Sequence, residues 1–217
     1  MLLEIKNINK SFSMREGDLP VLQNINDTVD KGELVALIGP SGAGKSTLMH
    51  IIGGLDKPTS GEIIFNGTNI YNMSESELNS YRGNNMGFIF QFHYLLDDFT
   101  ALENVMMPML LNGKDKNFAE NRAKDLISQV GLLDRLEHYP NEMSGGEQQR
   151  IAVARALANE PEIILADEPT GNLDKANSLA VLEILQKESS KGVAVIIVTH
   201  DEYIASVCQR RISLQKR

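Results

Sequence analysis

Residues 33–52 read ELVALIGPSGAGKSTLMHII, and this stretch decides the fold. Within it, Gly39–Ser46 fits the pattern G-x-x-x-x-G-K-[S/T]. The apolar run at residues 34–38 predicts a short central strand that is covered on both faces. Apolar residues three and four apart follow the pattern and predict a helix. A strand, a glycine-rich loop and a helix in this order predict a loop that binds phosphate.

The residue types in this loop explain why it suits a nucleotide. Glycines let backbone N–H groups converge on phosphate oxygens, and the helix start adds partial positive charge. Lys45 is long enough to reach the outer phosphates, and the Ser46 hydroxyl is a ligand for Mg²⁺. The alternative is a glycine-rich turn with an incidental lysine, and the flanking strand and helix argue against it.

Strand-like and helix-like segments alternate along the rest of the chain, which indicates a parallel sheet with helices on its faces. Strands are predicted within 2–8, 21–29, 58–70, 86–91, 162–168, 193–200 and 211–214. Helices are predicted within 74–82, 101–111, 117–132, 146–159, 178–189 and 201–208. Ser74 is expected to cap the first of these helices. The block from about 92 to 159 has helical character throughout and indicates a helical insertion into the sheet.

Length and composition exclude several classes of protein. The chain has 217 residues, 42% hydrophobic and 23% charged, with a formal net charge of −8. The length allows one large domain or one domain with an inserted subdomain, and the charge makes nucleic acid an unfavourable partner. The single cysteine, Cys208, has no internal partner and predicts a reducing cytosol. The start of the chain lacks the apolar core of a signal peptide, and no apolar run is long enough to span a bilayer. A membrane role would therefore require a separate partner.

A second apolar run ends in two acids. EIILADE, residues 162–168, delivers Asp167 and Glu168 at the end of a predicted strand. Beside a phosphate loop, such an aspartate supports Mg²⁺, and the neighbouring carboxylate orients or deprotonates the attacking water. The alternative is a strand that ends in two solvated acids.

A third feature is the sequence SGGEQQRIAVARALA, which begins at Ser144. Ser144 is a predicted N-cap, and two glycines leave the first turn of the helix narrow and open to an anion. The phosphate loop already holds the inner side of a nucleotide. A second helix start is therefore best explained by contact with the γ-phosphate across an interface between two chains.

The base-binding group is less defined. The guanine-reading motif N-K-x-D is absent from the sequence. Phe12, near the end of the first strand, is a candidate platform for stacking on a purine. The alternative is an aromatic side chain that packs on the core.

Taken together, GPSGAGKS, FQ at 90–91, MSGGE at 143–147, IILADE, NLD and TH resemble the ATP-binding cassette of ABC transporters over essentially the whole chain. This resemblance implies an α/β P-loop fold with a RecA-like, mainly parallel sheet, an N-terminal antiparallel β subdomain and the helical subdomain inserted at about 92–159. The chain, 1–217, would then be a single nucleotide-binding domain. The usual Leu-Ser-Gly-Gly-Gln signature is altered at Met143 and at Glu147, whose charge near a polyphosphate would weaken binding unless it points away.

The resemblance also implies residue roles and a homodimer that forms on ATP binding. Glu168 would act as general base, His200 would contact the γ-phosphate, Gln91 would touch Mg²⁺ and the attacking water, and Asp174 would communicate across the dimer. The residues implied to bind ATP are Phe12, Gly39, Pro40, Ser41, Gly42, Ala43, Gly44, Lys45, Ser46, Thr47, Ser144, Gly145 and Gly146. Catalysis would depend on Glu168, His200, Lys45 and Gln91, and Mg²⁺ on Ser46, Gln91 and Asp167.

A narrower resemblance lies in residues 53–67, 87–111 and 164–174, which are similar to the cassettes of lipoprotein-releasing, MacB-like and FtsE-like systems. It implies an ATPase subunit at the cytoplasmic face of the bacterial inner membrane, with release of lipoproteins as the function. MacB-like export and an FtsE-like cell-division role remain alternatives. Integral membrane permeases of the LolC/LolE type would bind the region after Gln91, where Pro108 is expected to end or kink a helix. Two other classes, a coiled-coil DNA-repair ATPase and a non-enzymatic scaffold, fit the sequence less well.

Overall fold

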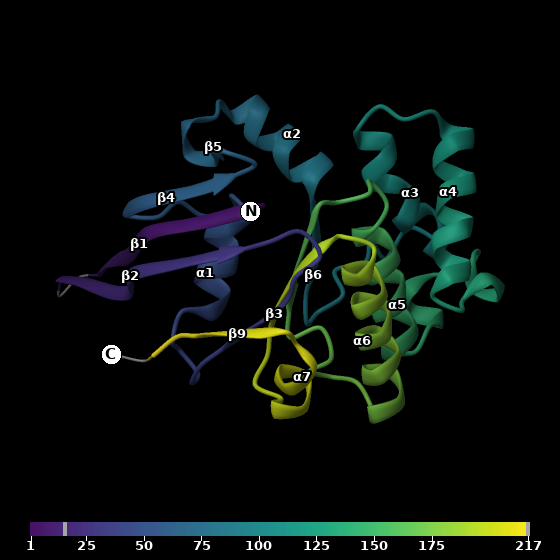
Figure 1. Cartoon of the computed structure of the whole chain (residues 1–217). Coiled ribbons are helices and arrows are strands. Elements are labelled where there is room, and N and C mark those ends of the chain that lie inside the picture. The colour runs from purple at the N-terminus through teal and green to yellow at the C-terminus, as the bar shows by residue number, and fades with distance from the viewer. Residues whose placement is uncertain (15–16, 216–217) are drawn as a thin grey trace.

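The structure is a computed structural model, and it describes residues 1–14 and 17–215. Two sheets form its framework (Figure 1). The first sheet is antiparallel, in the spatial order β2 (Gly17–Val29), β1 (Leu3–Met14), β4 (Ser60–Phe65) and β5 (Thr68–Asn69). The second is parallel, in the order β6 (Met86–Ile89), β7 (Ile163–Asp167), β8 (Ala194–Val198), β3 (Leu34–Ile38) and β9 (Arg210–Ser213). The predicted α/β fold, with a parallel core and an N-terminal antiparallel part, is confirmed.

Helices connect the strands of the parallel sheet and cover both of its faces. In chain order they are α1 (Lys45–Ile52), α2 (Glu75–Asn85), α3 (Ala101–Leu111), α4 (Lys116–Gln129), α5 (Gly145–Ala156), α6 (Lys175–Ser190) and α7 (Glu202–Val207). Short 3₁₀ helices are η1 (Ile70–Asn72), η2 (Leu133–Arg135) and η3 (Pro140–Glu142). Helices α3, α4 and α5 all lie between β6 and β7 in the chain, and Figure 1 shows α3 and α4 together at one end of the molecule.

Polar residues at the helix starts fix where several helices begin. Ser74 caps α2 as predicted, and Thr100 caps α3 in the same way. In both cases the cap hydroxyl accepts the N–H of a glutamate three residues later, whose carboxylate accepts the N–H of the cap residue. Helix α3 does not end at Pro108 but continues to Leu111. Its last turn therefore forms despite the hydrogen bond that proline cannot donate.

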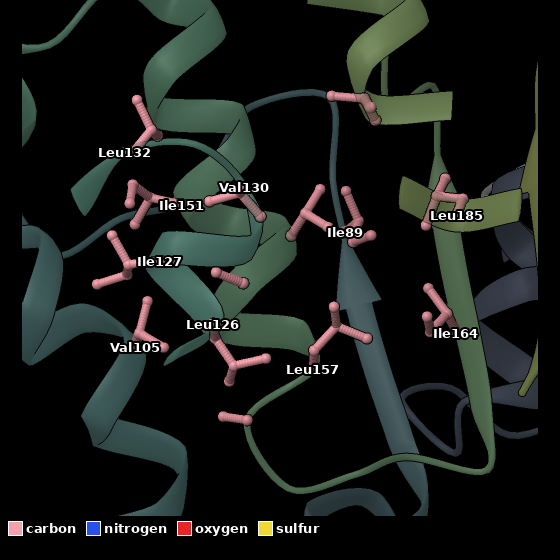
Figure 2. Packing of buried hydrophobic residues seen from close by; sticks show 14 of the residues in the cluster. Ile89, Val105, Leu126, Ile127, Val130, Leu132, Ile151, Leu157, Ile164 and Leu185 are labelled. Atoms are coloured by element: carbon pink, nitrogen blue, oxygen red, sulfur yellow. The ribbon is translucent and has the colours of Figure 1, made fainter. Parts of the chain in front are cut away.

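Strand β7 shows how the parallel sheet is buried on both sides. Ile163 and Leu165 belong to one apolar cluster, which includes residues of α1 and the antiparallel sheet. Ile164 and Ala166 belong to a second cluster with α3, α4, α5 and α6 (Figure 2). Each buried leucine or isoleucine contributes about 1.5–3 kcal/mol. Because side chains alternate between the faces of a strand, α1 and α5 are held on opposite faces of the same sheet.

The sequence predicts that no segment spans a membrane and that Cys208 has no internal disulfide partner. Within the described ranges 1–14 and 17–215, no helix is long and apolar enough to cross a membrane. Cys208 directly follows α7 and is half-buried, and its Sγ donates to the Ile204 carbonyl at 3.2 Å. Burial raises the pKa of this thiol to about 11. The thiol is therefore protonated at neutral pH.

Candidate functional site

The loop from Gly39 to Gly44 joins β3 to α1 and is shaped by its glycines. Gly44 caps α1 with φ of 89°, in the left-handed region, and the helix has no side-chain cap bond. A Cβ at Gly44 would lie 2.8 Å from Leu22 Cδ2 and 2.9 Å from Val21 Cγ1, so both backbone and packing require glycine. The first turn of α1 contains no acidic residue. Its N–H groups therefore face the loop without a competing anion.

Lys45 places a positive charge inside this loop. Its Nζ donates to the carbonyls of Gly39 at 2.9 Å and Pro40 at 3.2 Å. These two hydrogen bonds hold the Lys45 ammonium against the backbone of the loop. The phosphate-binding pattern predicts that this backbone surrounds the phosphates of a nucleotide.

A cavity of about 460 Å³ brings most of the predicted residues together. Its lining residues are Val21, Gly39, Ser41, Gly42, Gly44, Lys45, Ser46, Thr47, Gln91, Asp167, Glu168, Val198 and His200. Pro40 and Ala43 of the loop lie outside this lining, and Ala43 is buried. Val21 within β2 and Val198 at the end of β8 were not predicted, since apolar residues of a strand carry no chemical signal in the sequence.

The acids at the end of β7 occupy different positions. Asp167 is the last residue of the strand, and Glu168 follows with φ of 47°, a conformation that is unusual for a residue with a side chain. The Glu168 Oε1 lies 2.8 Å from the His200 Nδ1. This hydrogen bond, with the charge of the carboxylate, raises the pKa of His200. The predicted general base and the histidine predicted to contact the γ-phosphate are thus paired in this structure.

Gln91 enters the same cavity from the neighbouring strand. It lies two residues beyond the end of β6, which pairs with β7 in parallel register. A Cβ added at Gly171 would lie 3.1 Å from the Gln91 Nε2. The loop after β6 and the loop after β7 are therefore in close contact.

Phe12 lies apart from the cavity. Its side chain is exposed and is not among the lining residues. The Lys10 Nζ lies 4.7 Å from the centre of the Phe12 ring, which is a cation–π distance. The alternative of an aromatic packed in the core is therefore wrong, and stacking on a purine stays a prediction.

Ser144, Gly145 and Gly146 also lie outside this cavity, at the start of α5. Ser144 caps α5 as predicted. The Glu147 carboxylate accepts the Ser144 N–H and hydroxyl, both at 2.8 Å, and the Arg135 Nε at 2.9 Å. The hydrogen bonds from Ser144, and then Arg135, lower the pKa of Glu147 to about 2. The acid that departs from the usual signature is thus bound within its own chain.

The two glycines of this helix start have different surroundings. A Cβ at Gly145 would meet no atom within 4 Å, whereas one at Gly146 would lie 2.3 Å from the Asn177 Cγ. Asn177 belongs to α6, which Asp174 caps by accepting the Asn177 N–H at 2.8 Å. The start of α5 is therefore packed on the start of α6, and only Gly145 leaves open space.

Among residues 1–14 and 17–215, no group of three or more His, Cys, Asp or Glu side chains is arranged to hold a metal ion. The cavity instead offers single oxygen donors from Ser46, Gln91 and Asp167. Oxygen donors of this kind suit Mg²⁺, which usually takes only one or two carboxylates and completes its shell with phosphates.

Comparison with known proteins agrees with this arrangement. The family model for ABC transporters matches residues 22–171. A Geobacter metallireducens protein named "Lipoprotein-releasing system ATP-binding protein LolD" is 50% identical, over 98% of this chain and 95% of its own. A Methanocaldococcus jannaschii protein named "Uncharacterized ABC transporter ATP-binding protein MJ1508" is 47% identical, over 99% and 96%. A solved dimeric, post-hydrolysis structure of the ATP-binding cassette MJ0796 with ADP and Pi has a TM-score of 0.91 and 39% identity, over 98% of this chain and 94% of that one.

Proposed function

This chain belongs to the ABC transporter family, and we propose that it is the ATP-hydrolysing subunit of a lipoprotein-releasing transporter. Its relative of that name, at 50% identity over nearly the full length of both chains, supports the choice of system. The whole of 1–217 would act as one nucleotide-binding domain, with its helical part at about 92–159.

One observation carries the proposal: the residues assigned to a single nucleotide lie in two separate places. Lys45, Glu168 and their neighbours line one cavity, whereas Ser144 and Gly145 start a helix that packs on the opposite face of the sheet from α1. Two copies arranged head to tail would bring the start of α5 in one copy to the cavity of the other. Each chain would then complete the nucleotide site of its partner.

Within such a site, the chain mainly neutralises charge. Lys45 and the N–H groups of the phosphate loop bind the phosphate oxygens, and the start of the partner's α5 binds the γ-phosphate. Ser46, Gln91 and Asp167 would hold Mg²⁺, whose charge further neutralises the triphosphate. Phe12 would stack on adenine.

Glu168 positions and deprotonates the water that attacks the γ-phosphate. Its carboxylate is bound to His200 in the isolated chain, so water has to share or replace that hydrogen bond. The raised pKa of His200 favours its charged form, which suits contact with a phosphate oxygen. Because ATP binds the closed dimer more tightly than the open one, closure supplies work, and hydrolysis ends it.

The membrane partner would bind beside the loop that follows Gln91. There a second cavity of about 460 Å³ has apolar walls that include Phe88, Phe90, Met107 and Leu111. Amphipathic helices bind apolar grooves of this kind through their apolar face. The proposed occupant is a cytoplasmic helix of a LolC/LolE-type permease, which places this subunit at the cytoplasmic face of the bacterial inner membrane.

The alternative classes differ in their partners. In the part of the chain that the structure describes, the longest helix is α6 with 16 residues, which is too short for the coiled-coil arm of a DNA-repair ATPase. Copurification separates the remaining systems. A four-span permease with a large periplasmic domain supports lipoprotein release, whereas a cell-division partner supports the FtsE-like role.

The test is a Glu168→Gln variant, which should bind ATP without hydrolysing it. We expect this variant to run as a monomer without nucleotide and as a dimer with ATP and Mg²⁺ on a sizing column. The matched control is Glu168→Gln combined with Lys45→Ala, which should remain monomeric because it cannot hold the triphosphate. A Glu168→Gln protein that binds ATP but stays monomeric would rule out the head-to-tail site.

A further inference from the structure

Gln149 is a buried amide that the nucleotide site described above does not use. It lies on α5, five residues after Ser144, and is 1% exposed. Its Nε2 donates to the Pro169 carbonyl at 2.8 Å and to the Phe90 carbonyl at 3.3 Å. Pro169 directly follows Glu168, and Phe90 directly precedes Gln91. The Gln149 side chain thus binds a backbone carbonyl next to each of the two residues, Glu168 and Gln91, that are assigned to the attacking water.

The choice of glutamine follows from these two bonds. An amide nitrogen carries two hydrogens, so a single neutral side chain satisfies two carbonyls at once. The oxygen of the same amide forms no hydrogen bond of this kind, because the Gln149 Oε1 is buried and has no partner among the described residues. A buried oxygen without a protein donor is unfavourable for folding. The position therefore keeps an unfavourable acceptor in order to present two donors without a buried charge.

The backbone at Glu168 explains why such a tie is needed. Its φ of 47° lies in the left-handed region, which is less favourable for a residue with a side chain than the ordinary right-handed region. A strained residue persists only where its surroundings hold it. Two backbone bonds do so, from the Glu168 N–H to the Val198 carbonyl and from the Gly171 N–H to the Glu168 carbonyl, both at 3.0 Å. Gln149 adds a third restraint, on the carbonyl of the very next residue.

We propose that Gln149 is a positioning residue that fixes Glu168 and Gln91 relative to each other and ties both to the helix that starts at Ser144. The inference rests on the proposed function, because it concerns the same hydrolytic site. Gln149 touches neither nucleotide nor water. It acts through the two carbonyls that it holds, and it makes the strand ends of β6 and β7 move with α5.

The same helix provides a matched control. The neighbouring residue Gln148 also uses its Nε2 as a double donor, to the Pro140 carbonyl at 2.8 Å and the Met143 carbonyl at 3.0 Å. Those carbonyls precede α5, in and after η3, and neither borders Gln91 or Glu168. Gln148→Met therefore removes two bonds of the same kind from the same helix, without loosening the loops after β6 and β7.

The experiment compares Gln149→Met with Gln148→Met in the full-length protein, by steady-state ATP hydrolysis and melting temperature. For Gln149→Met we expect kcat to fall about 10- to 100-fold with KM for ATP within about twofold, because a misplaced base slows chemistry without removing phosphate contacts. Gln148→Met should lower the melting temperature similarly; because Met143 directly precedes Ser144, it should raise KM for ATP, while its kcat should stay within about twofold of wild type. Gln149→Asn, which keeps the amide but is too short to reach both carbonyls, should repeat the loss of kcat if methionine prevents folding.

The outcomes separate this inference from the proposed function. The positioning role would be overturned if a folded Gln149 variant and Gln148→Met had equal kcat values, whether both kept the wild-type kcat or both lost it to the same extent. Failure of Glu168→Gln to dimerise with ATP would instead contradict the head-to-tail site itself. Dimerisation of Glu168→Gln together with full turnover by Gln149→Met would leave the proposed function intact and remove only the inference.

Discussion

The starts of α1 and α5 are both assigned to phosphate, yet they are built in opposite ways. Helix α1 begins at Gly44, without a side-chain cap and without an acid in its first turn. Helix α5 begins at Ser144, with a capping box that includes Glu147. The first is open to an anion by its own geometry, whereas the second already holds an anion from its own chain. The phosphate loop thus lies within one copy, whereas in the proposed head-to-tail dimer the start of α5 would have to exchange partners when a triphosphate arrives.

The Ser144 hydroxyl forms the hydrogen bond that would be exchanged. It carries one hydrogen, which it donates to the Glu147 carboxylate at 2.8 Å. A γ-phosphate oxygen can accept that hydrogen only if Glu147 releases it. The same capping box occurs at α2 and α3, but in the described part of the chain neither Glu77 nor Glu103 forms an ion pair, whereas Glu147 is paired with Arg135. In the proposed dimer, Arg135 would therefore give the displaced carboxylate a partner.

The largest effect is expected at α1. Lys45→Ala should lower ATP turnover by about 10²- to 10³-fold, because it removes the charge that neutralises the outer phosphates. Lys31→Ala is the control, since its Nζ pairs with Glu162 at 2.7 Å away from the cavity. Steady-state hydrolysis measures both. Equal turnover of the Lys45 variant and wild type would exclude the phosphate loop as the nucleotide site.

A smaller effect at α5 should depend on the second copy. Gly145→Ala has room in the isolated chain, so its melting temperature and ATP binding as a monomer should match wild type. In the Glu168→Gln background, we expect the ATP concentration for half-maximal dimerisation to rise about tenfold, because the added methyl blocks the approach of the triphosphate. Analytical ultracentrifugation measures this shift.

The contrasting variant is Gly44→Ala, whose methyl clashes with Leu22 inside one chain. It should lower the melting temperature whether or not ATP is present. If Gly145→Ala left the ATP concentration for half-maximal dimerisation unchanged, the open space at α5 would have no role in dimerisation.

The smallest effect concerns the charge at α5. Arg135→Met should raise the ATP concentration for half-maximal dimerisation about three- to fivefold, because it leaves the Glu147 charge uncompensated near the triphosphate. The same substitution in a Glu147→Gln background should have no effect, since no charge remains to compensate. Equal shifts in both backgrounds would show that Arg135 does not act through Glu147.

The sequence predicted what local rules determine. The strand before the phosphate loop, the two acids that end β7 and the caps at Ser74 and Ser144 each depend on neighbours within a few residues. These features account for the fold and for the cavity beside the phosphate loop. The separation of Ser144 from that cavity was also expected, because the sequence predicts two phosphate-binding helix starts in one chain.

Tertiary contacts could not be predicted in this way. Arg135 reaches Glu147 only because η2 packs beside the start of α5, and no spacing rule joins residues 12 apart. Gln149 stands among polar residues and gives no sign that it is buried. The positive φ of Glu168 is equally hidden, since glutamate has no preference for that region.

Cys208 has a practical consequence for testing the dimer. Its half-buried thiol, with a pKa raised to about 11, forms little of the thiolate that reacts with maleimides and disulfides near neutral pH. A cysteine introduced at Ser144 would therefore be the dominant site of labelling or crosslinking, with the native cysteine left in place. Covalent trapping of the two copies thus needs no cysteine-free background.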